Sequence, residues 1–212
     1  MTLKRAFSLA EVLITLMIIG VIAGMTIPAL KKDSMNKTVA TNLKKIYSEM
    51  NQSFSMVLAE NFTNRVCRTG LFDDADTFEE EFVMKKFNVA TVCSAGSASK
   101  CFGNSNLIGS EKSYLLTSGI AVAFSSPENA CDDDNAAHLM IYIDVNGPTP
   151  PNKGGTDQFI LGVNGFGSVF VGSSSDSVGG YTSQACGNAT DDYEAAWACA
   201  IQIQRDGWEV KY

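Results

Sequence analysis

Oxygen-bearing side chains gather in one segment, Asp144 to Phe159, which reads DVNGPTPPNKGGTDQF. Asp144 and Asn146 are two residues apart, and Asp157 follows a stretch rich in proline and glycine. Hard oxygen ligands at this spacing suit calcium, which takes about six to eight oxygens. No glutamate closes an EF-hand loop, and the alternative is a turn whose side chains bond to their own backbone. The sequence therefore predicts either a calcium site or a self-capped loop.

Other constellations give weaker signals for chemistry. The acidic run at 131–135 (CDDDN) is either a cation-binding cluster or a solvated loop. The glycine-rich GVNGFG at 162–167 precedes no predicted helix, so it does not match a dinucleotide fingerprint. A Ser-His-Asp site would need His138, the only histidine, which begins an apolar strand and is expected to be buried or at a strand edge. We therefore expect a protein that is not an enzyme.

Cysteine usage points to an exported domain. The chain has six cysteines, and all lie in its last three quarters: Cys67, Cys93, Cys101, Cys131, Cys186 and Cys199. An even number in an exported domain indicates up to three disulfides, with unpaired buried thiols as the alternative. No C-x-x-C pair supports zinc. We expect Cys186 to pair with Cys199, and the other four to pair among themselves.

Charge argues against a nucleic-acid partner. The formal net charge is −7, from 16 basic and 23 acidic side chains. Without Lys4 and Arg5 the basic count falls to 14, and the net charge becomes −9. No basic stripe is available to neutralise phosphates. Beyond the N-terminal region, the chain is long enough for one domain with its own core.

The N-terminal region has the length and composition of a membrane helix. Lys4 and Arg5 precede an uncharged apolar run from Val12 to Leu30. At about 1.5 Å per residue this run spans roughly 28 Å, close to the hydrocarbon thickness of a bilayer. Glu11 stands at the start of the run. A carboxylate there is costly unless it is paired, which indicates a functional role.

Helical periodicity continues beyond the apolar run. Apolar residues recur at helical spacing, with lysine, asparagine and glutamate between them: Val39, Leu43, Ile46, Tyr47, Met50, Phe54, Val57 and Leu58. We therefore predict one helix over 7–60, apolar all round in its first half and amphipathic in its second. Pro28 lacks a backbone N–H and is expected to bend the helix.

The remainder supplies a surface for the amphipathic half to cover. Short strands are predicted at 114–116, 120–124, 138–145, 158–163 and 168–171, and helices at 73–82 and 191–204. Residues 95–106 and 172–180 are predicted loops. One long helix followed by short strands joined by turns predicts an α+β fold, with the helix packed on a small antiparallel sheet.

The N-terminal residues resemble the class III signal of type IV pilins and type II secretion pseudopilins. The matching residues are the basic leader of six residues and the block FSLAEVLITLMIIGVIAGMTIPAL. The resemblance implies cleavage by a prepilin peptidase between Ala6 and Phe7, where the family usually has glycine in place of Ala6, followed by N-methylation of Phe7. It also implies that Glu11, fifth in the mature chain, is the assembly glutamate and Pro28 the helix-bending proline.

The same resemblance extends into the predicted head domain. The segment at 144–159 resembles a D-x-N-G…P-N-x-x-G-x-D-x-F signature of pseudopilin-like domains, some of which bind calcium nearby. It implies Asp144, Asn146 and Asp157 as ligands, with Asn152 as a lesser candidate. Arg205 to Trp208 resembles the family's closing D-G-W stretch, a turn before a last edge strand.

The resemblance implies a pilin-like lollipop with a leader (1–6), a transmembrane and filament-core helix (7–30), an amphipathic helix (31–60) and a head (61–212). Such a subunit would sit in the cytoplasmic membrane with its head outside, and then join a periplasmic or cell-surface filament. Its partners would be other subunits, the prepilin peptidase and an inner-membrane assembly platform. The alternatives are an ordinary signal peptide, and an uncleaved anchor that holds an exported adhesin or binding module which never polymerises.

Overall fold

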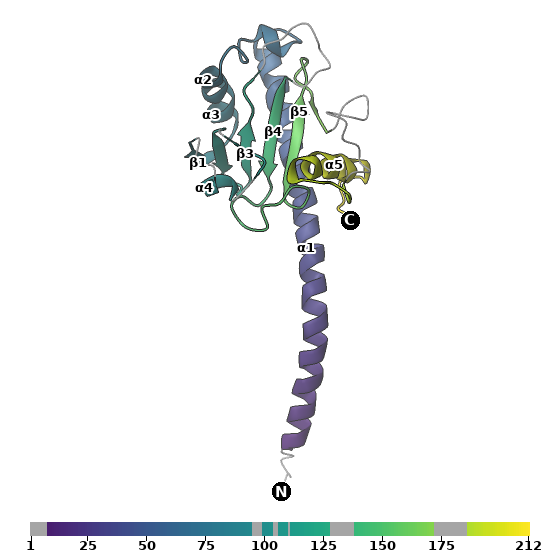
Figure 1. The fold of residues 1–212 in the computed structure, drawn as a ribbon. Coiled ribbons are helices and arrows are strands. Elements are labelled where there is room, and N and C mark those ends of the chain that lie inside the picture. Colours follow the sequence, from purple (N-terminus) through teal and green to yellow (C-terminus); the bar gives the residue numbers. More distant parts are fainter. Residues whose placement is uncertain (1–7, 95–98, 104–105, 110, 128–137, 172–185) are drawn as a thin grey trace. The chain divides into compact units, whose positions relative to one another are not determined.

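The computed structural model describes residues 8–94, 99–103, 106–109, 111–127, 138–171 and 186–212 (Figure 1). The chain divides into two compact units, Met1–Thr38 and Val39–Tyr212, and each is considered by itself. The fold is α+β, with a long N-terminal helix and an antiparallel sheet, as the sequence predicts.

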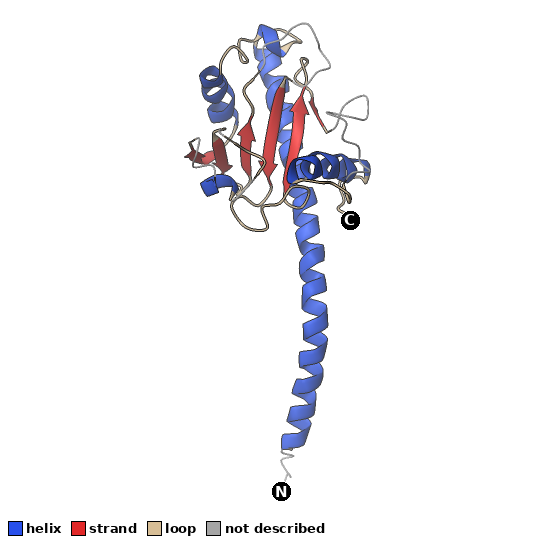
Figure 2. Cartoon of the chain, viewed as in Figure 1, coloured by secondary structure: helices blue, strands red, loops and turns tan. Residues whose placement is uncertain are grey.

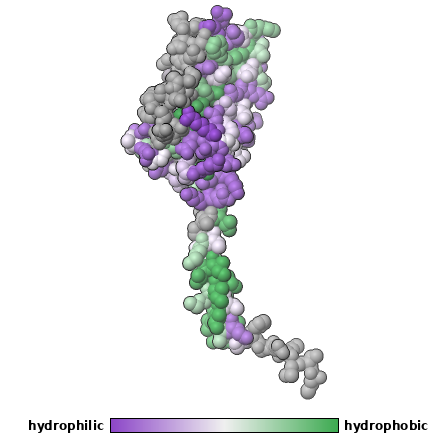
Figure 3. Space-filling view, turned by 90° about the vertical axis from the view of Figure 1, so that its right-hand side faces the viewer, coloured by the Kyte–Doolittle hydropathy of each residue, from purple (hydrophilic) through white to green (hydrophobic). Residues whose placement is uncertain are grey.

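Helix α1 (Leu9–Glu60) is 52 residues long and begins in the first unit. It passes through Pro28 without interruption, so this proline does not end the helix. Its apolar side chains in this unit are exposed, and Figure 3 shows them as a green column. By length and composition this stretch is able to cross a membrane.

In the second unit the amphipathic part of α1 covers one face of the sheet. Leu43, Ile46, Met50 and Phe54 have no exposed surface, and they share one core cluster with the sheet. Two amides beside this apolar stripe also reach the sheet side. Asn42 Nδ2 donates to Val145 O at 2.9 Å, and Asn51 Oδ1 accepts from Val169 N at 3.0 Å. The helix is therefore held by both packing and hydrogen bonds.

The sheet is a six-stranded antiparallel meander in which each strand pairs with its sequence neighbour (Figure 2). Its strands are β1 (Val89–Cys93), β2 (Ser113–Leu116), β3 (Ala121–Phe124), β4 (Leu139–Asp144), β5 (Gln158–Val163) and β6 (Val169–Phe170). The turn from β2 to β3 contains Gly119 at φ +85°, a conformation that glycine adopts without strain. The β2–β3 and β5–β6 connections are short turns, whereas the other connections between neighbouring strands are longer.

Both faces of the central strands are buried, because helices cover each side. Ile141 and Ile143 of β4 face the cluster that contains α1, while Tyr142 between them belongs to a second cluster. The second cluster holds Trp197 of helix α5 (Asp192–Arg205) and Phe102 of helix α4 (Ser99–Phe102). Helix α5 packs on β5, and Figure 1 shows it beside that strand.

A broken helical segment follows α1. It consists of η1 (Val66–Arg68), α2 (Ala75–Phe78), the π-helical η2 (Glu79–Val83) and α3 (Met84–Lys86). Asp74 caps α2, since its Oδ1 accepts from Thr77 N at 2.8 Å. Phe78 and Phe82 stack at 5.1 Å between ring centroids, and Phe82 also stacks on Phe54 of α1 at 4.3 Å. These rings bury the apolar face of the segment.

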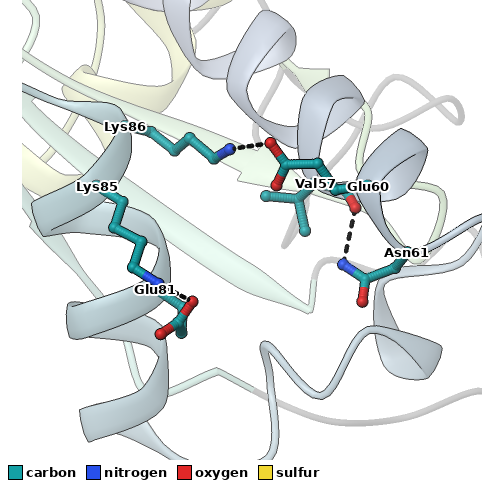
Figure 4. Close-up of polar contacts among 6 residues, drawn as sticks. All are labelled: Val57, Glu60, Asn61, Glu81, Lys85 and Lys86. Carbon is teal, nitrogen blue, oxygen red and sulfur yellow. Dashed lines mark hydrogen bonds and ion pairs between the residues drawn. The ribbon is translucent and has the colours of Figure 1, made fainter.

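The end of α1 is tied down by polar contacts (Figure 4). Asn61 Nδ2 donates to Val57 O at 2.9 Å, in addition to the backbone bond from Asn61 N to the same carbonyl at 3.1 Å. Lys86 Nζ lies 2.7 Å from Glu60 Oε1, which joins α3 to the end of α1. Phe62 follows at φ +51°, outside helical geometry, and its side chain is exposed.

Three features differ from the sequence-based expectation. Strand β1 was not predicted, and α4 lies in the stretch 95–106 that was predicted to be a loop. After α5, Gly207 and Trp208 form the expected turn with positive φ, but no strand follows within 186–212. Trp208 instead packs on Tyr47 of α1, 5.1 Å between ring centroids. This contact partly buries the tryptophan without a further strand.

Candidate functional site

Glu11 is held by the start of its own helix. Ser8 N and Ser8 Oγ donate to Glu11 Oε2 at 2.8 and 2.9 Å, and Glu11 N donates to Ser8 Oγ at 3.3 Å. This reciprocal pattern is a capping box, in which serine and glutamate satisfy two N–H groups that the first turn leaves open. Among the described residues, Glu11 Oε1 accepts no hydrogen bond. Glu11 was a predicted site residue and Ser8 was not, although the S-x-x-E spacing from Ser8 to Glu11 is typical of a capping box.

The processing residues Ala6 and Phe7 lie outside the described residues. Their predicted cleavage and methylation stay predictions. So does a bend at Pro28, because only the continuity of the helix is established there.

Two glycines interrupt the apolar surface of α1. Gly20 and Gly24 are four residues apart, which places them on one face of the helix. A Cβ atom built on either one would meet nothing within 4 Å. The G-x-x-x-G spacing allows a second helix to approach closely in an apolar environment. This motif was not among the sequence-based predictions, although its spacing is visible in the sequence.

The second candidate site is the β4–β5 loop, residues 145–157, with Asp144 and Gln158 at its ends. Asp144 and Asp157 are almost completely buried, with exposed fractions of 0% and 1%. Asp157 Oδ1 accepts from Lys153 N at 2.7 Å, and Asp157 Oδ2 accepts from Asn152 N at 2.8 Å. The structure thus brings the two predicted carboxylates to the ends of one loop, where Asp157 caps the backbone.

Asp144 is bonded in a similar way. Its Oδ1 accepts from Asn146 N at 3.2 Å, and its Oδ2 accepts from Gln158 Nε2 at 2.8 Å. With its amide oriented to satisfy its surroundings, Asn152 also donates to Asp144 Oδ2, at 3.3 Å. Burial raises the pKa of Asp144 to about 8, and the negative charge of Asp157 adds to this effect. The hydrogen bonds from Gln158 and Asn146 act in the opposite direction.

These contacts test whether the loop suits calcium. All four carboxylate oxygens of Asp144 and Asp157 already accept N–H groups, whereas calcium requires oxygens directed at the ion. The side-chain oxygen of Asn146 is buried and has no hydrogen-bond partner among the described residues, so it is one remaining ligand atom. Within the described ranges, no group of three or more His, Cys, Asp or Glu side chains is arranged to hold a metal. As arranged, the loop fits self-capping and does not fit calcium.

The loop also supports α5. A Cβ on Gly154 would lie 1.9 Å from Asp192 O, and one on Gly155 would lie 2.7 Å from Cys199 Sγ. Tyr212, near the C-terminus, donates its hydroxyl to Gly155 O at 2.8 Å. The two glycines therefore permit a backbone-to-helix approach that any side chain would obstruct.

Disulfides hold both helices that cover the second cluster. Cys93 at the end of β1 is bonded to Cys101 in α4, and Cys186 is bonded to Cys199 in α5. The second of these is the pair that the sequence analysis put together. Cys67 is also disulfide-bonded, and Cys131 lies outside the described residues. His138 is buried at the start of β4.

Comparison with known proteins adds no relative. No protein-family model matches the chain, and neither a curated protein nor a solved structure is significantly similar to it.

Proposed function

We propose that this chain is a structural subunit, a pilin or pseudopilin, of a type IV pilus or type II secretion filament. In this proposal a prepilin peptidase removes the leader at Ala6 and Phe7 becomes the mature N-terminus. The subunit then waits in the cytoplasmic membrane with its head domain outside. An inner-membrane assembly platform transfers it into a periplasmic or cell-surface filament, whose partners are further subunits.

One observation carries the proposal: α1 exposes a long apolar surface that contains one carboxylate, Glu11, at its first turn. A membrane anchor needs the apolar surface, but it does not need the carboxylate. A charged side chain costs about 3 kcal/mol at the centre of a membrane helix, and an unpaired carboxylate towards its end retains part of that cost. The bonds from Ser8 reduce this cost in the single subunit, and they leave Glu11 Oε1 available to another donor.

The donor in the assembled state would be the N-terminal amine of a neighbouring subunit. Cleavage before Phe7 creates this amine, and it is cationic even when methylated. In a medium of low dielectric an ammonium and a carboxylate attract strongly, and either group alone is costly. The pair would therefore fix the axial register between subunits.

Packing around this pair would come from the apolar surface of α1. Gly20 and Gly24 offer a face on which a second helix can lie close, because no side chain stands between the backbones. Leucine, isoleucine and methionine side chains on the remaining surface would then fill the bundle. The head domain, which has its own core, would stay folded outside the bundle.

Substitution of Glu11 tests the proposal. Glu11→Ala should reduce the yield of sheared filaments at least about tenfold, since a lost ion pair of a few kcal/mol changes an equilibrium by more than that factor. Glu49→Ala is the matched control, because Glu49 is a partly exposed glutamate of the same helix that pairs with Lys45 at 3.8 Å. Its filament yield should stay near that of the unsubstituted chain.

Intact-mass and N-terminal peptide analysis of the membrane fraction completes the test. A chain that begins at methylated Phe7 supports the proposal. A chain that keeps its leader, together with a Glu11→Ala variant of unchanged behaviour, would identify a static anchor for an adhesin or binding module instead.

A further inference from the structure

The β4–β5 loop contains two buried aspartates close to one another in the chain, and such an arrangement ordinarily needs positive charge or donors nearby. Here the chain supplies donors. The backbone N–H groups of Asn146, Asn152 and Lys153 each bond to one carboxylate oxygen, at 2.7 to 3.2 Å. These three donors satisfy three of the four carboxylate oxygens without a cation.

Gln158 provides the most informative of these donors. Its side chain is 1% exposed at the start of β5. Its Nε2 donates to Asp144 Oδ2 at 2.8 Å and to Phe102 O at 3.2 Å. A carboxylate oxygen and a backbone carbonyl oxygen are both ligands that calcium uses. The amide nitrogen, with its two N–H groups, therefore bonds to two oxygens of a kind that calcium also binds.

The geometry points to the Gln158 amide as a built-in substitute for a cation, so that the β4–β5 loop folds without calcium. This role belongs to the head domain and does not depend on the filament proposal. It explains how one loop organises several elements. Gln158 connects β4 and β5 to α4 through Phe102 O, and Asn42 connects α1 to the loop through Val145 O.

The charge of the side chain at position 158 distinguishes a loop that is held by an amide donor from a loop that is held by a cation. A glutamine donates to Asp144 and Phe102 O. A glutamate in its place would add a third acidic side chain and remove this donor from both oxygens, which would leave Asp144 Oδ2 with only the longer bond from Asn152. A buried acceptor that loses its donor is destabilising. A divalent cation could then take the vacated position between the substituted carboxylate, Asp144 and Phe102 O, because all three would offer oxygen.

Thermal unfolding of the full-length chain in detergent tests this inference, with EGTA or with millimolar CaCl2. The unsubstituted chain should melt at the same temperature in both. Gln158→Glu should melt roughly 5 to 10 °C lower in EGTA, and calcium should restore part of that loss. Gln52→Glu, at an exposed glutamine of α1, is the control and should respond to neither change.

Two results would overturn the inference. One is a saturable rise in the melting temperature of the unsubstituted chain with calcium, which would show that the loop binds the ion after all. The other is a Gln158→Glu variant as stable in EGTA as the unsubstituted chain, since the amide donors would then be dispensable. If Gln158→Glu does not fold, Gln158→Met replaces it. That variant should be destabilised and insensitive to calcium, and unchanged stability would again contradict the inference.

Discussion

Asp144 is a buried carboxyl group whose ionisation couples folding to pH. Burial raises its pKa to about 8, from an ordinary value of 3.8. Between these values the folded chain holds a proton that the unfolded chain releases. The free energy of unfolding should therefore be greatest below about pH 4, as far as Asp144 is concerned, and decrease as the pH rises towards 8.

Denaturant unfolding at pH 5 and pH 8 measures this dependence. The unsubstituted chain should be less stable at pH 8, and Asp144→Asn, which cannot titrate, should show a smaller difference between the two values. Equal pH differences for both chains would mean that other groups cause the effect. The exposed Glu80→Gln substitution controls for the loss of one negative charge.

At the same scale, the aspartates of the β4–β5 loop show what residue spacing can and cannot predict. Asp144, Asn146 and Asp157 were recognisable because acidic residues around a glycine-rich turn are typical of both cation sites and self-capped loops. The choice between the two depends on where the donors lie. The Gln158 amide comes from the following strand, and its second acceptor, Phe102 O, is 56 residues away in sequence. A local sequence pattern cannot show that residues so far apart in the chain lie close together in the fold.

Among the elements, the contact between the β4–β5 loop and α5 is the most sensitive to side-chain size. Gly154→Ala should destabilise the head by roughly 2 kcal/mol or more, because the new Cβ would lie 1.9 Å from Asp192 O and the loop or α5 must move. Gly187→Ala is the control, since a Cβ there meets nothing within 4 Å.

Chemical denaturation measures the stability of the two glycine variants, and limited proteolysis measures how readily α5 becomes exposed in each. Gly154→Ala should unfold at lower denaturant concentration and expose α5 to cleavage earlier than Gly187→Ala. Equal curves for the two variants would show that the loop yields to the extra methyl group without cost.

The elements differ in how well the sequence predicted them. Strands β3, β4 and β5 were predicted because each is a nearly continuous run of apolar residues, which is typical of strands buried on both faces. Strand β1 is an edge strand with three exposed residues in a row, so its apolar pattern is weak. Helix α4 has four residues in a segment rich in serine and glycine, and its position depends on the Cys93–Cys101 bond. A tertiary constraint of that kind has no signature in local periodicity.

For the whole molecule, the apolar α1 and the disulfide-bonded head require different surroundings. The apolar part of α1 suits a bilayer or a helix bundle, whereas disulfides persist in oxidising compartments outside the cytoplasm. The two requirements are met together when the helix is anchored in a membrane and the head is exported, which agrees with the proposed function.

The disulfide that holds α5 should contribute more to the stability of the head than the one that holds α4. Cys186 and Cys199 are 13 residues apart and Cys93 and Cys101 are 8 apart, and closing a longer loop removes more entropy from the unfolded chain. Cys199 is also buried against Gly155, so its replacement by alanine leaves a gap.

The Cys186→Ala/Cys199→Ala pair should lower the free energy of unfolding by about 3 kcal/mol or more, and the Cys93→Ala/Cys101→Ala pair by less. Denaturant unfolding of the full-length chain in detergent measures both. The reverse order would mean that α4, despite its four residues, is the more important support of the sheet.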